Sequence, residues 1–170
     1  YNIYPSTGCA IQDAIGAKNA IAFDITVACT GMLYALEIGR HFINSGKYKN
    51  VLLVATDTNS KFLDWTDRAS CVLFGDGAGA MILTEAKDGV DDIVALNVNA
   101  DGSKGAFITM NLVGENCPLV EPAVLGQHKI AMVGKEVYKF VVQTMPESIM
   151  KCLEDAKMEP KDIEYLVPLQ

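Results

Sequence analysis

One cysteine occupies a position from which its sulfur atom could act as a nucleophile. Cys29 follows the apolar run 20–27, which we interpret as a buried strand, and it opens a segment to about Asn44 that is typical of a helix. The unpaired N–H groups and the positive dipole end at a helix N-terminus favour thiolate over thiol. The same N–H groups could stabilise the oxyanion formed on a bound thioester. Position alone leaves an alternative open, because free cysteines are commonly buried as small core residues.

The composition excludes several classes of function. The 170 residues carry 14 Lys+Arg against 21 Asp+Glu, and this net charge of −7 argues against a nucleic-acid-binding surface. No apolar run reaches the roughly 18 residues that a membrane span needs, and no secretory pattern opens the chain. The 5 cysteines are odd in number and include no Cys-x-x-Cys. We therefore expect neither a disulfide scaffold nor a metal site, and we expect a reducing, cytoplasmic location.

The elements that must position Cys29 alternate between strands and helices, which predicts an α/β fold with a buried sheet. The helix after Cys29 carries no charge over 31–36, so we expect its N-terminal half to be buried. The acidic stretch 85–92 contains Gly89 and is a plausible boundary between 1–86 and 91–170. The predicted helices are 9–15, 29–44 and 134–157, the last kinked or divided at Pro146; the predicted strands are 20–27, 51–55, 70–74, 81–84, 93–99, 107–112 and 165–167.

The residues around Cys29 resemble those of a known family. Residues 22–31 read Ala-Phe-Asp-Ile-Thr-Val-Ala-Cys-Thr-Gly, which closely resembles the nucleophile segment of β-ketoacyl-acyl-carrier-protein synthase III. Four further segments resemble that family in the same order along the chain: 5–12, 65–80, 132–140 and 165–168. Because the resemblance runs almost end to end, the only families with which this one could seriously be confused are its thiolase-fold relatives.

The resemblance implies a fold, a reaction and partners. The family has a thiolase fold, a layered α/β sandwich of two similar halves, and is usually a homodimer. This chain would cover the middle of it incompletely: 1–86 as the latter part of the first half, and 91–170 as the beginning of the second. Cys29 would take an acyl group, acetyl by this resemblance, from acyl-coenzyme A. Malonyl-acyl-carrier protein would then lose CO₂ and attack the thioester. This reaction initiates fatty-acid biosynthesis and needs no cofactor besides the coenzyme A thioester substrate.

The resemblance also assigns substrate-binding residues, each with an ordinary structural alternative. Arg68 resembles the family arginine beside the adenine and phosphates of coenzyme A, although it could simply pair with Asp64 or Asp67. Trp65 lies in the same loop and could stack on a ligand or pack. Three residues resemble the substrate-tunnel lining and one resembles the aromatic that reaches the partner's acyl pocket, although packing alone would explain them: Met132, Gly134 and Tyr138, and Tyr4 respectively.

One departure bears on activity. The family motif Val-Pro-His-Gln-Ala-Asn reads Val167-Pro168-Leu169-Gln170 here, so Leu169 stands where the family has its catalytic histidine. Leucine donates no hydrogen bond, and losing such a donor typically costs about 10²–10³ in rate. His41 would lie about 18 Å from Cys29 along one helix, which is too far for proton transfer. His128 is a weak candidate to replace the missing histidine. A truncated or non-catalytic thiolase-fold subunit and an acyl-transfer-only, polyketide-type relative are therefore alternatives.

Two other patterns carry no expected chemistry. Residues 75–79 are rich in glycine, but their spacing differs from Gly-x-Gly-x-x-Gly and a strand follows, so a dinucleotide loop is rejected. Asp24 is interpreted as a structural carboxylate. The remaining cysteines, including Cys117, are interpreted as structural or incidental thiols.

Overall fold

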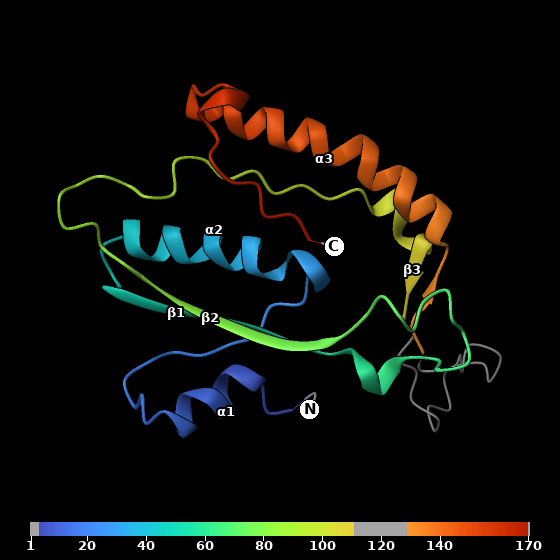
Figure 1. Ribbon diagram of the computed structural model, residues 1–170. Helices are drawn as coiled ribbons and strands as arrows, with labels where there is room; N and C mark the ends of the chain where they lie inside the picture. Colours follow the sequence, from blue (N-terminus) through green and yellow to red (C-terminus); the bar gives the residue numbers. More distant parts are fainter. Residues whose placement is uncertain (1–3, 111–128, 170) are drawn as a thin grey trace. The chain divides into compact units, whose positions relative to one another are not determined.

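The computed structural model describes residues 4–110 and 129–169, which combine helices with short and long strands (Figure 1). These residues fall into two compact units, one formed by 1–56 with 78–90 and the other by 57–77 with 91–170. The elements are α1 Thr7–Ala14, α2 Gly31–Asn44, β1 Asn50–Thr58, β2 Asp76–Thr84, β3 Ile108–Thr109, β4 Ala131–Met132 and α3 Gly134–Ala156, with 3-10 turns at Ala28–Thr30, Asn59–Phe62, Gly102–Phe107 and Pro160–Asp162.

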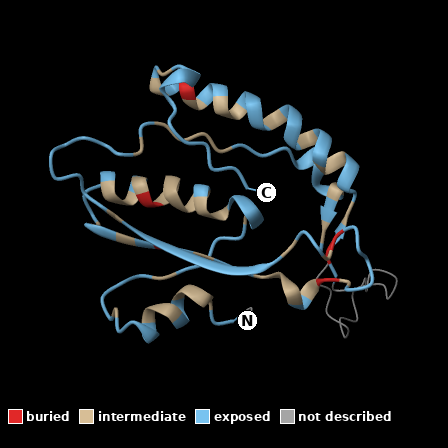
Figure 2. Ribbon diagram, viewed as in Figure 1, coloured by how far each residue is buried: buried red, intermediate tan, exposed pale blue. Residues whose placement is uncertain are grey.

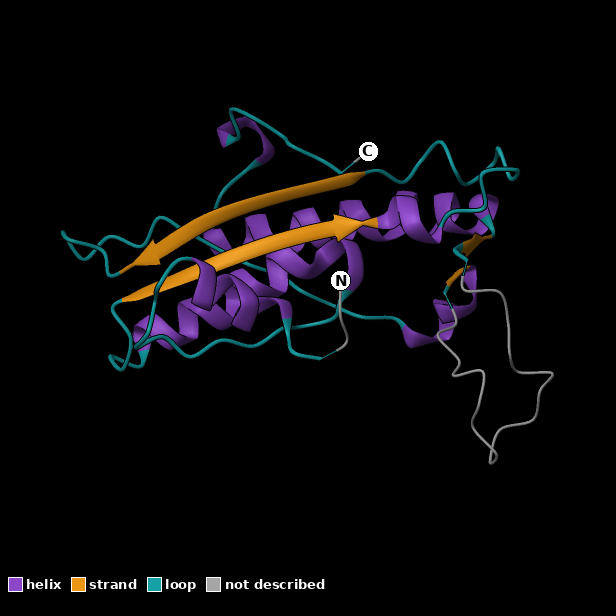
Figure 3. Ribbon diagram, turned by 90° about the horizontal axis from the view of Figure 1, so that it is seen from below, coloured by secondary structure: helices purple, strands orange, loops and turns teal. Residues whose placement is uncertain are grey.

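The first unit is built on a sheet of β1 and β2, which run in opposite directions in Figure 3. Helix α2 covers one face of this sheet, and Figure 1 shows α1 on the other side. The contact with α2 centres on Gly39, the buried residue of that helix. A Cβ atom there would lie 2.9 Å from Leu83 Cδ1 and 3.2 Å from Leu53 Cδ2, so the missing side chain lets helix and sheet approach closely.

The second unit joins α3 to a short antiparallel pair. Strands β3 and β4 pair with Ile108 opposite Met132 and Thr109 opposite Ala131, and α3 begins two residues after β4. Asn97, on the chain before β3, donates its side-chain amide to Ser148 of α3 at 3.2 Å from the hydroxyl oxygen. The buried side chains of this unit are Leu63, Ser70, Ile130 and Leu153.

The helix predictions are confirmed, because helices are specified locally. The Ser6 hydroxyl accepts the Cys9 N–H at 3.2 Å and so caps the N-terminus of α1. Helix α2 ends before Ser45, as predicted. Helix α3 contains Pro146 without interruption, so the two-helix alternative is wrong. Its last turn is closed by Lys157 in the left-handed conformation.

Several predicted strands are wrong. Residues 20–27, 93–99 and 165–167 pair with no strand, and residues 70–74 are mainly turns. A strand requires a ladder partner, and apolar composition does not supply one. The predicted Gly-rich link before 81–84 is itself part of one continuous strand, β2. The predicted strand 107–112 is confirmed only at Ile108–Thr109; residues 111 and 112 lie outside the described part.

Burial is lower than predicted (Figure 2). In β1 only Leu53 is buried, and in α2 only Gly39. The expectation that the N-terminal half of α2 is buried is wrong: the Leu33 side chain is 48% exposed. Most other residues of α2 are half-buried, and Leu33, His41 and Asn44 are exposed.

The described residues contain neither a membrane-spanning helix nor a cluster of metal ligands. None of the helices is long and apolar enough to cross a membrane. No group of three or more His, Cys, Asp or Glu side chains in the same residues is arranged to hold a metal ion.

Candidate active site

Cys29 lies in the 3-10 turn Ala28–Thr30 that leads directly into α2, which is the predicted position (Figure 1). The residue is exposed and its thiol is free. Ala28 has a φ of 48°, in the left-handed region that residues with a Cβ atom rarely adopt. Such conformations persist where surrounding contacts hold them and are concentrated at functional sites. The backbone therefore turns sharply one residue before the sulfur.

Hydrogen bonds hold this turn. The Thr30 hydroxyl donates to the Val27 carbonyl oxygen at 2.9 Å, and the Gly31 N–H donates to the carbonyl oxygen of Ala28. No side chain caps α2 at Thr30 in the described structure. Apart from the Gly31 N–H, which bonds to Ala28, no first-turn amide of α2 is taken by a capping side chain from the described residues, and these amides can stabilise negative charge near Cys29.

The chain before Cys29 is attached to α1 by Asp24, a role that the sequence analysis did not predict. Its Oδ2 accepts the Thr7 N–H and its Oδ1 accepts the Gly8 N–H, both at 2.7 Å. The Cys9 thiol donates to the Ala22 carbonyl oxygen at 3.6 Å. The bonded residues are 13 to 17 positions apart, so no local pattern revealed the contact. The prediction that Asp24 is structural fits these bonds.

Trp65 and Arg68 lie in a turn of the second unit that two aspartates organise. Asp64 accepts the Thr66 hydroxyl at 2.7 Å and the Thr66 N–H at 3.0 Å, and these bonds lower the pKa of its carboxyl. Asp67 accepts hydrogen bonds from the Ala69 N–H and the Ser70 hydroxyl.

The Trp65 and Arg68 side chains in that turn remain accessible to a ligand. In the described structure Arg68 forms an ion pair with neither Asp64 nor Asp67. Arg68 is exposed, and Trp65 is 65% exposed. The ordinary alternative for Arg68, pairing with a neighbouring aspartate, is therefore not what holds its side chain.

The same turn is bonded to the chain just before β4. The Ile130 N–H donates to the Phe62 carbonyl oxygen at 2.8 Å, and Lys129 Nζ donates to the Leu63 carbonyl oxygen at 3.2 Å. Three predicted binding residues follow at once: Met132 in β4, Gly134 at the first position of α3, and Tyr138, which is 71% exposed. The second unit thus brings its five predicted binding residues, those three with Trp65 and Arg68, into neighbouring segments.

The remaining candidates are surface residues or lie outside the description. Tyr4 belongs to the first unit and is 87% exposed. His41 is exposed, and its Nδ1 lies 2.8 Å from the Glu37 carbonyl oxygen of the same helix. Leu169 is 73% exposed. His128 and Cys117 lie outside the described residues.

The sequence and the fold both match one group of enzymes. The 3-oxoacyl-[acyl-carrier-protein] synthase III family matches residues 23–102. A β-ketoacyl-[acyl-carrier-protein] synthase III of Clostridium perfringens is 46% identical over 169 residues, 99% of this chain and 52% of that relative. This chain is similar to the β-ketoacyl-acyl-carrier-protein synthases III over about half of their length.

Solved structures agree with this relationship. The synthase III of Aquifex aeolicus VF5 superposes with a TM-score of 0.83 at 38% identity, covering 95% of this chain and 48% of that protein. A priming β-ketosynthase from the R1128 polyketide pathway superposes with a TM-score of 0.80 at 29% identity, covering 96% and 48%. The predicted thiolase-like α/β fold is confirmed, and the chain spans about half the length of the relatives it matches.

Proposed function

We propose that the protein carrying this chain is a β-ketoacyl-acyl-carrier-protein synthase III, and that Cys29 is its nucleophile. The observation that carries the proposal is the exposed Cys29 thiol, placed by the left-handed Ala28 at the uncapped start of α2. It lies within the residues that the family matches. The relatives' names favour this activity over a non-catalytic fragment.

In the proposed first step the Cys29 thiolate attacks the carbonyl carbon of acetyl-coenzyme A or another acyl-coenzyme A. The carbonyl oxygen becomes an oxyanion, which the first-turn amides of α2 can stabilise. Collapse of this intermediate breaks the carbon–sulfur bond to coenzyme A, which leaves as its thiolate. The acyl group then remains on Cys29 as a thioester.

In the second step malonyl-acyl-carrier protein loses CO₂, and the resulting carbanion attacks the acyl carbonyl carbon. A carbon–carbon bond forms, the Cys29 thiolate is released, and the product is a 3-oxoacyl thioester on the carrier protein. Fatty-acid biosynthesis would begin with this step. We propose a homodimer in a reducing, cytoplasmic compartment, which suits an odd number of cysteines and the four free thiols among the described residues.

In this proposal the predicted binding residues bind the coenzyme A thioester. The fork of Arg68, free of Asp64 and Asp67, suits a phosphate, and Trp65 offers an exposed ring beside it for stacking on adenine. Met132, Gly134 and Tyr138 would line the path of the pantetheine arm, and Tyr4 would restrict acyl length. The division of the chain into parts of two thiolase-like halves, 1–86 and 91–170, stays a prediction.

The test is acylation of the full-length gene product with labelled acetyl-coenzyme A, followed by peptide mass spectrometry. We expect the label on Cys29, its loss in Cys29→Ala, and its retention in Cys9→Ala, which removes another exposed thiol. A folded protein without label on Cys29 would remove the assignment.

Leu169 favours a second candidate, acyl transfer without condensation. An alkyl side chain cannot donate to the thioester oxyanion of the malonyl unit. Coenzyme A release and CO₂ release are therefore measured separately. Transfer alone predicts coenzyme A release with little CO₂, and Leu169→His should then raise CO₂ release by about 10²–10³. Equal release of both products by the natural protein would exclude this candidate.

A further inference from the structure

The segment that leads to Cys29 is fixed to α1 by a carboxylate. Asp24 accepts the N–H groups of Thr7 and Gly8, each at 2.7 Å. Both amides belong to the first turn of α1, where backbone N–H groups have no partner within the helix. Hydrogen bonds from amides to an ionised carboxylate are stronger than neutral ones, and the helix dipole favours negative charge at this end.

The backbone on either side of Asp24 lies directly against α1. A Cβ atom on Gly8 would lie 3.0 Å from the Phe23 carbonyl oxygen and 3.1 Å from Asp24 Oδ1. The Cys9 thiol donates to the carbonyl oxygen of Ala22 at 3.6 Å. The glycine is what permits this approach, since a side chain at position 8 would push helix and segment apart.

The same segment also contacts α2. The Phe23 and Phe42 rings meet edge to face, with centroids 6.2 Å apart and planes at 80°. Residues 22–24 are therefore held on one side by α1, through Asp24, and on the other by α2, through Phe23. The chain continues from this double attachment to Ala28, where φ is 48°, and then to Cys29.

Between Asp24 and Ala28 the chain has little packing of its own: Ile25 and Thr26 are exposed and Val27 is half-buried. The direction in which residues 25–28 leave α1 therefore depends on the Asp24 attachment. An unfavourable backbone conformation such as that of Ala28 persists only when the surrounding structure holds it in place. The Thr30–Val27 bond holds the downstream end, and Asp24 holds the upstream end.

We propose that Asp24 is a positioning residue for Cys29: its carboxylate, bonded to the Thr7 and Gly8 amides, fixes the segment that presents the Cys29 sulfur at the start of α2. Asp24 does not touch the substrate and takes no part in proton transfer. The inference rests on the proposed function insofar as acylation is its readout. It predicts that α1, a helix without a catalytic residue, controls the rate at Cys29.

The test compares Asp24→Ala and Asp24→Asn with Ser6→Ala in the full-length gene product. Ser6 is the matched control, because its hydroxyl also caps the first turn of α1 but bonds to Cys9 N within that helix. We expect the rate constant for acylation by saturating acetyl-coenzyme A to fall about 10- to 100-fold in Asp24→Ala. Asp24→Asn should fall less, because its amide oxygen still accepts one N–H. Ser6→Ala should change by no more than about twofold.

Rate and amplitude separate positioning from stability. Loss of folded protein lowers the fraction of Cys29 that becomes acylated, whereas mispositioning lowers the rate constant of the folded fraction. Gly8→Ala, which keeps the carboxylate but enlarges the contact with Phe23, should also lower the rate constant. Equal rate constants in Asp24→Ala and Ser6→Ala, with only the amplitude reduced, would overturn the proposal.

Alkylation of Cys29 by iodoacetamide, read at the peptide level, keeps this test independent of the enzyme's substrate. If the natural protein is alkylated at Cys29 but never acylated, the proposed function fails while the positioning role is still decided. In that case a several-fold slower alkylation in Asp24→Ala than in Ser6→Ala supports the role, and equal rates overturn it.

Discussion

Asp76 accepts two hydrogen bonds from a single residue, Ser60. The Ser60 N–H donates to Oδ1 at 2.8 Å and the Ser60 hydroxyl donates to Oδ2 at 2.6 Å. Asn59 adds a bond from its side-chain amide to the Gly75 carbonyl oxygen at 3.3 Å. The 3-10 turn after β1 is thereby joined to the first residue of β2. The loop that contains Trp65 and Arg68 is closed at its base by these bonds.

Because Ser60 bonds to the Asp76 carboxyl, the stability that these bonds contribute depends on pH. The Ser60 hydroxyl, and then its N–H, lower the pKa of the Asp76 carboxyl from its ordinary 3.8. A lowered pKa contributes stability above the ordinary value, and that stability is lost as the pH falls through the lowered pKa. We therefore expect Asp76→Ala to be less stable than the natural protein at pH 7, with the difference in unfolding free energy shrinking in acid. Urea unfolding at a series of pH values measures it.

Asp88→Ala is the control for this experiment, because it removes an exposed carboxylate from the turn before Gly89. It should leave the stability at pH 7 nearly unchanged. A difference between Asp76→Ala and the natural protein that stays constant from neutral pH to below about 3 would contradict the attribution to the ionised carboxylate.

The close approach of α2 to its sheet makes Gly39 sensitive to side-chain size. A methyl group in Gly39→Ala would lie close to the flexible ends of Leu83 and Leu53, at 2.9 and 3.2 Å, and would touch Val51 Cγ1 at 3.4 Å. The helix gains about 1 kcal/mol of propensity over glycine. The close contacts and the gain in propensity oppose each other, so we expect the free energy of unfolding to change by no more than about 1 kcal/mol. Gly39→Leu overfills the contact and should cost about 1–3 kcal/mol. Chemical denaturation measures both.

His41→Leu places the same new side chain on an exposed position of α2 and serves as the control. Its cost should stay within about 0.5 kcal/mol. If Gly39→Leu were as well tolerated as His41→Leu, the helix would not approach the sheet at Gly39 as described.

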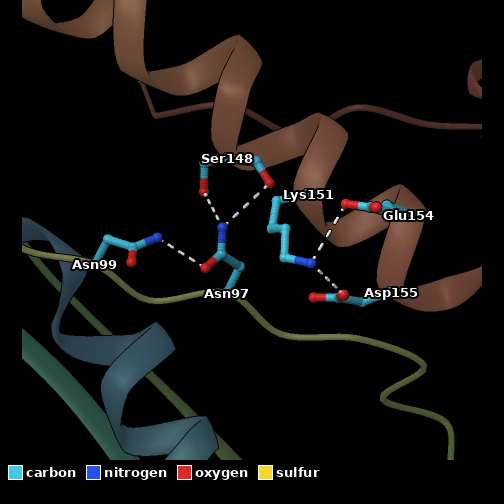
Figure 4. A network of polar contacts seen from close by, with 6 residues as sticks. All are labelled: Asn97, Asn99, Ser148, Lys151, Glu154 and Asp155. Atoms are coloured by element: carbon cyan, nitrogen blue, oxygen red, sulfur yellow. Dashed lines mark hydrogen bonds and ion pairs between the residues drawn. The ribbon is translucent and has the colours of Figure 1, made fainter.

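Asn97 connects the chain before β3 to α3 (Figure 4). Its amide nitrogen lies 3.2 Å from the Ser148 hydroxyl oxygen and 3.5 Å from the Ser148 carbonyl oxygen, and its own oxygen accepts from Asn99 at 2.7 Å. Ser148→Ala removes one acceptor and keeps the carbonyl, so it should cost about 0.5–1.5 kcal/mol. In a double-mutant cycle with Asn97→Ala the two losses should be less than additive. Additive losses would show that this bond does not connect the two elements.

The helices could be predicted from the sequence because their hydrogen bonds and caps lie within one segment. Ser6 begins α1, Ser45 follows α2, and the apolar residues of α3 recur at four-residue spacing up to Leu153. The apolar stretch 20–27 misled the strand prediction, because pairing depends on residues far away in sequence. The same stretch instead makes side-chain and ring contacts with α1 and α2.

The candidate nucleophile could be predicted because its signal is local, a cysteine at the start of a helix. The attachment through Asp24 could not, because its partners Thr7 and Gly8 are 17 and 16 residues away. Nor could the left-handed conformation of Ala28, since alanine carries no sequence signal for a positive φ. The start of α2 after Cys29 can therefore be predicted from this sequence, whereas the long-range contacts of Asp24 cannot.

Lys151 pairs with two carboxylates on the exposed surface of α3. This pairing predicts that the stability of the protein decreases at alkaline pH. Its Nζ lies 2.7 Å from Asp155 Oδ1 and 3.3 Å from Glu154 Oε2 (Figure 4). The Asp155 bond, and then the Glu154 bond, raise the pKa of Lys151 above its ordinary 10.5. A raised pKa contributes stability below the ordinary value, and that stability is lost as the pH rises through the raised pKa.

Lys151→Gln should therefore lower the thermal unfolding midpoint at neutral pH, and the difference from the natural protein should narrow as the pH rises above about 10.5. Lys139→Gln is the matched control, because Lys139 pairs with one carboxylate, Glu136, on the same helix. Its effect should be smaller. Both effects should decline at about 1 M salt, where the Debye length is about 3 Å. An unchanged Lys151→Gln effect in high salt would mean that the side chain stabilises α3 by packing and not by charge.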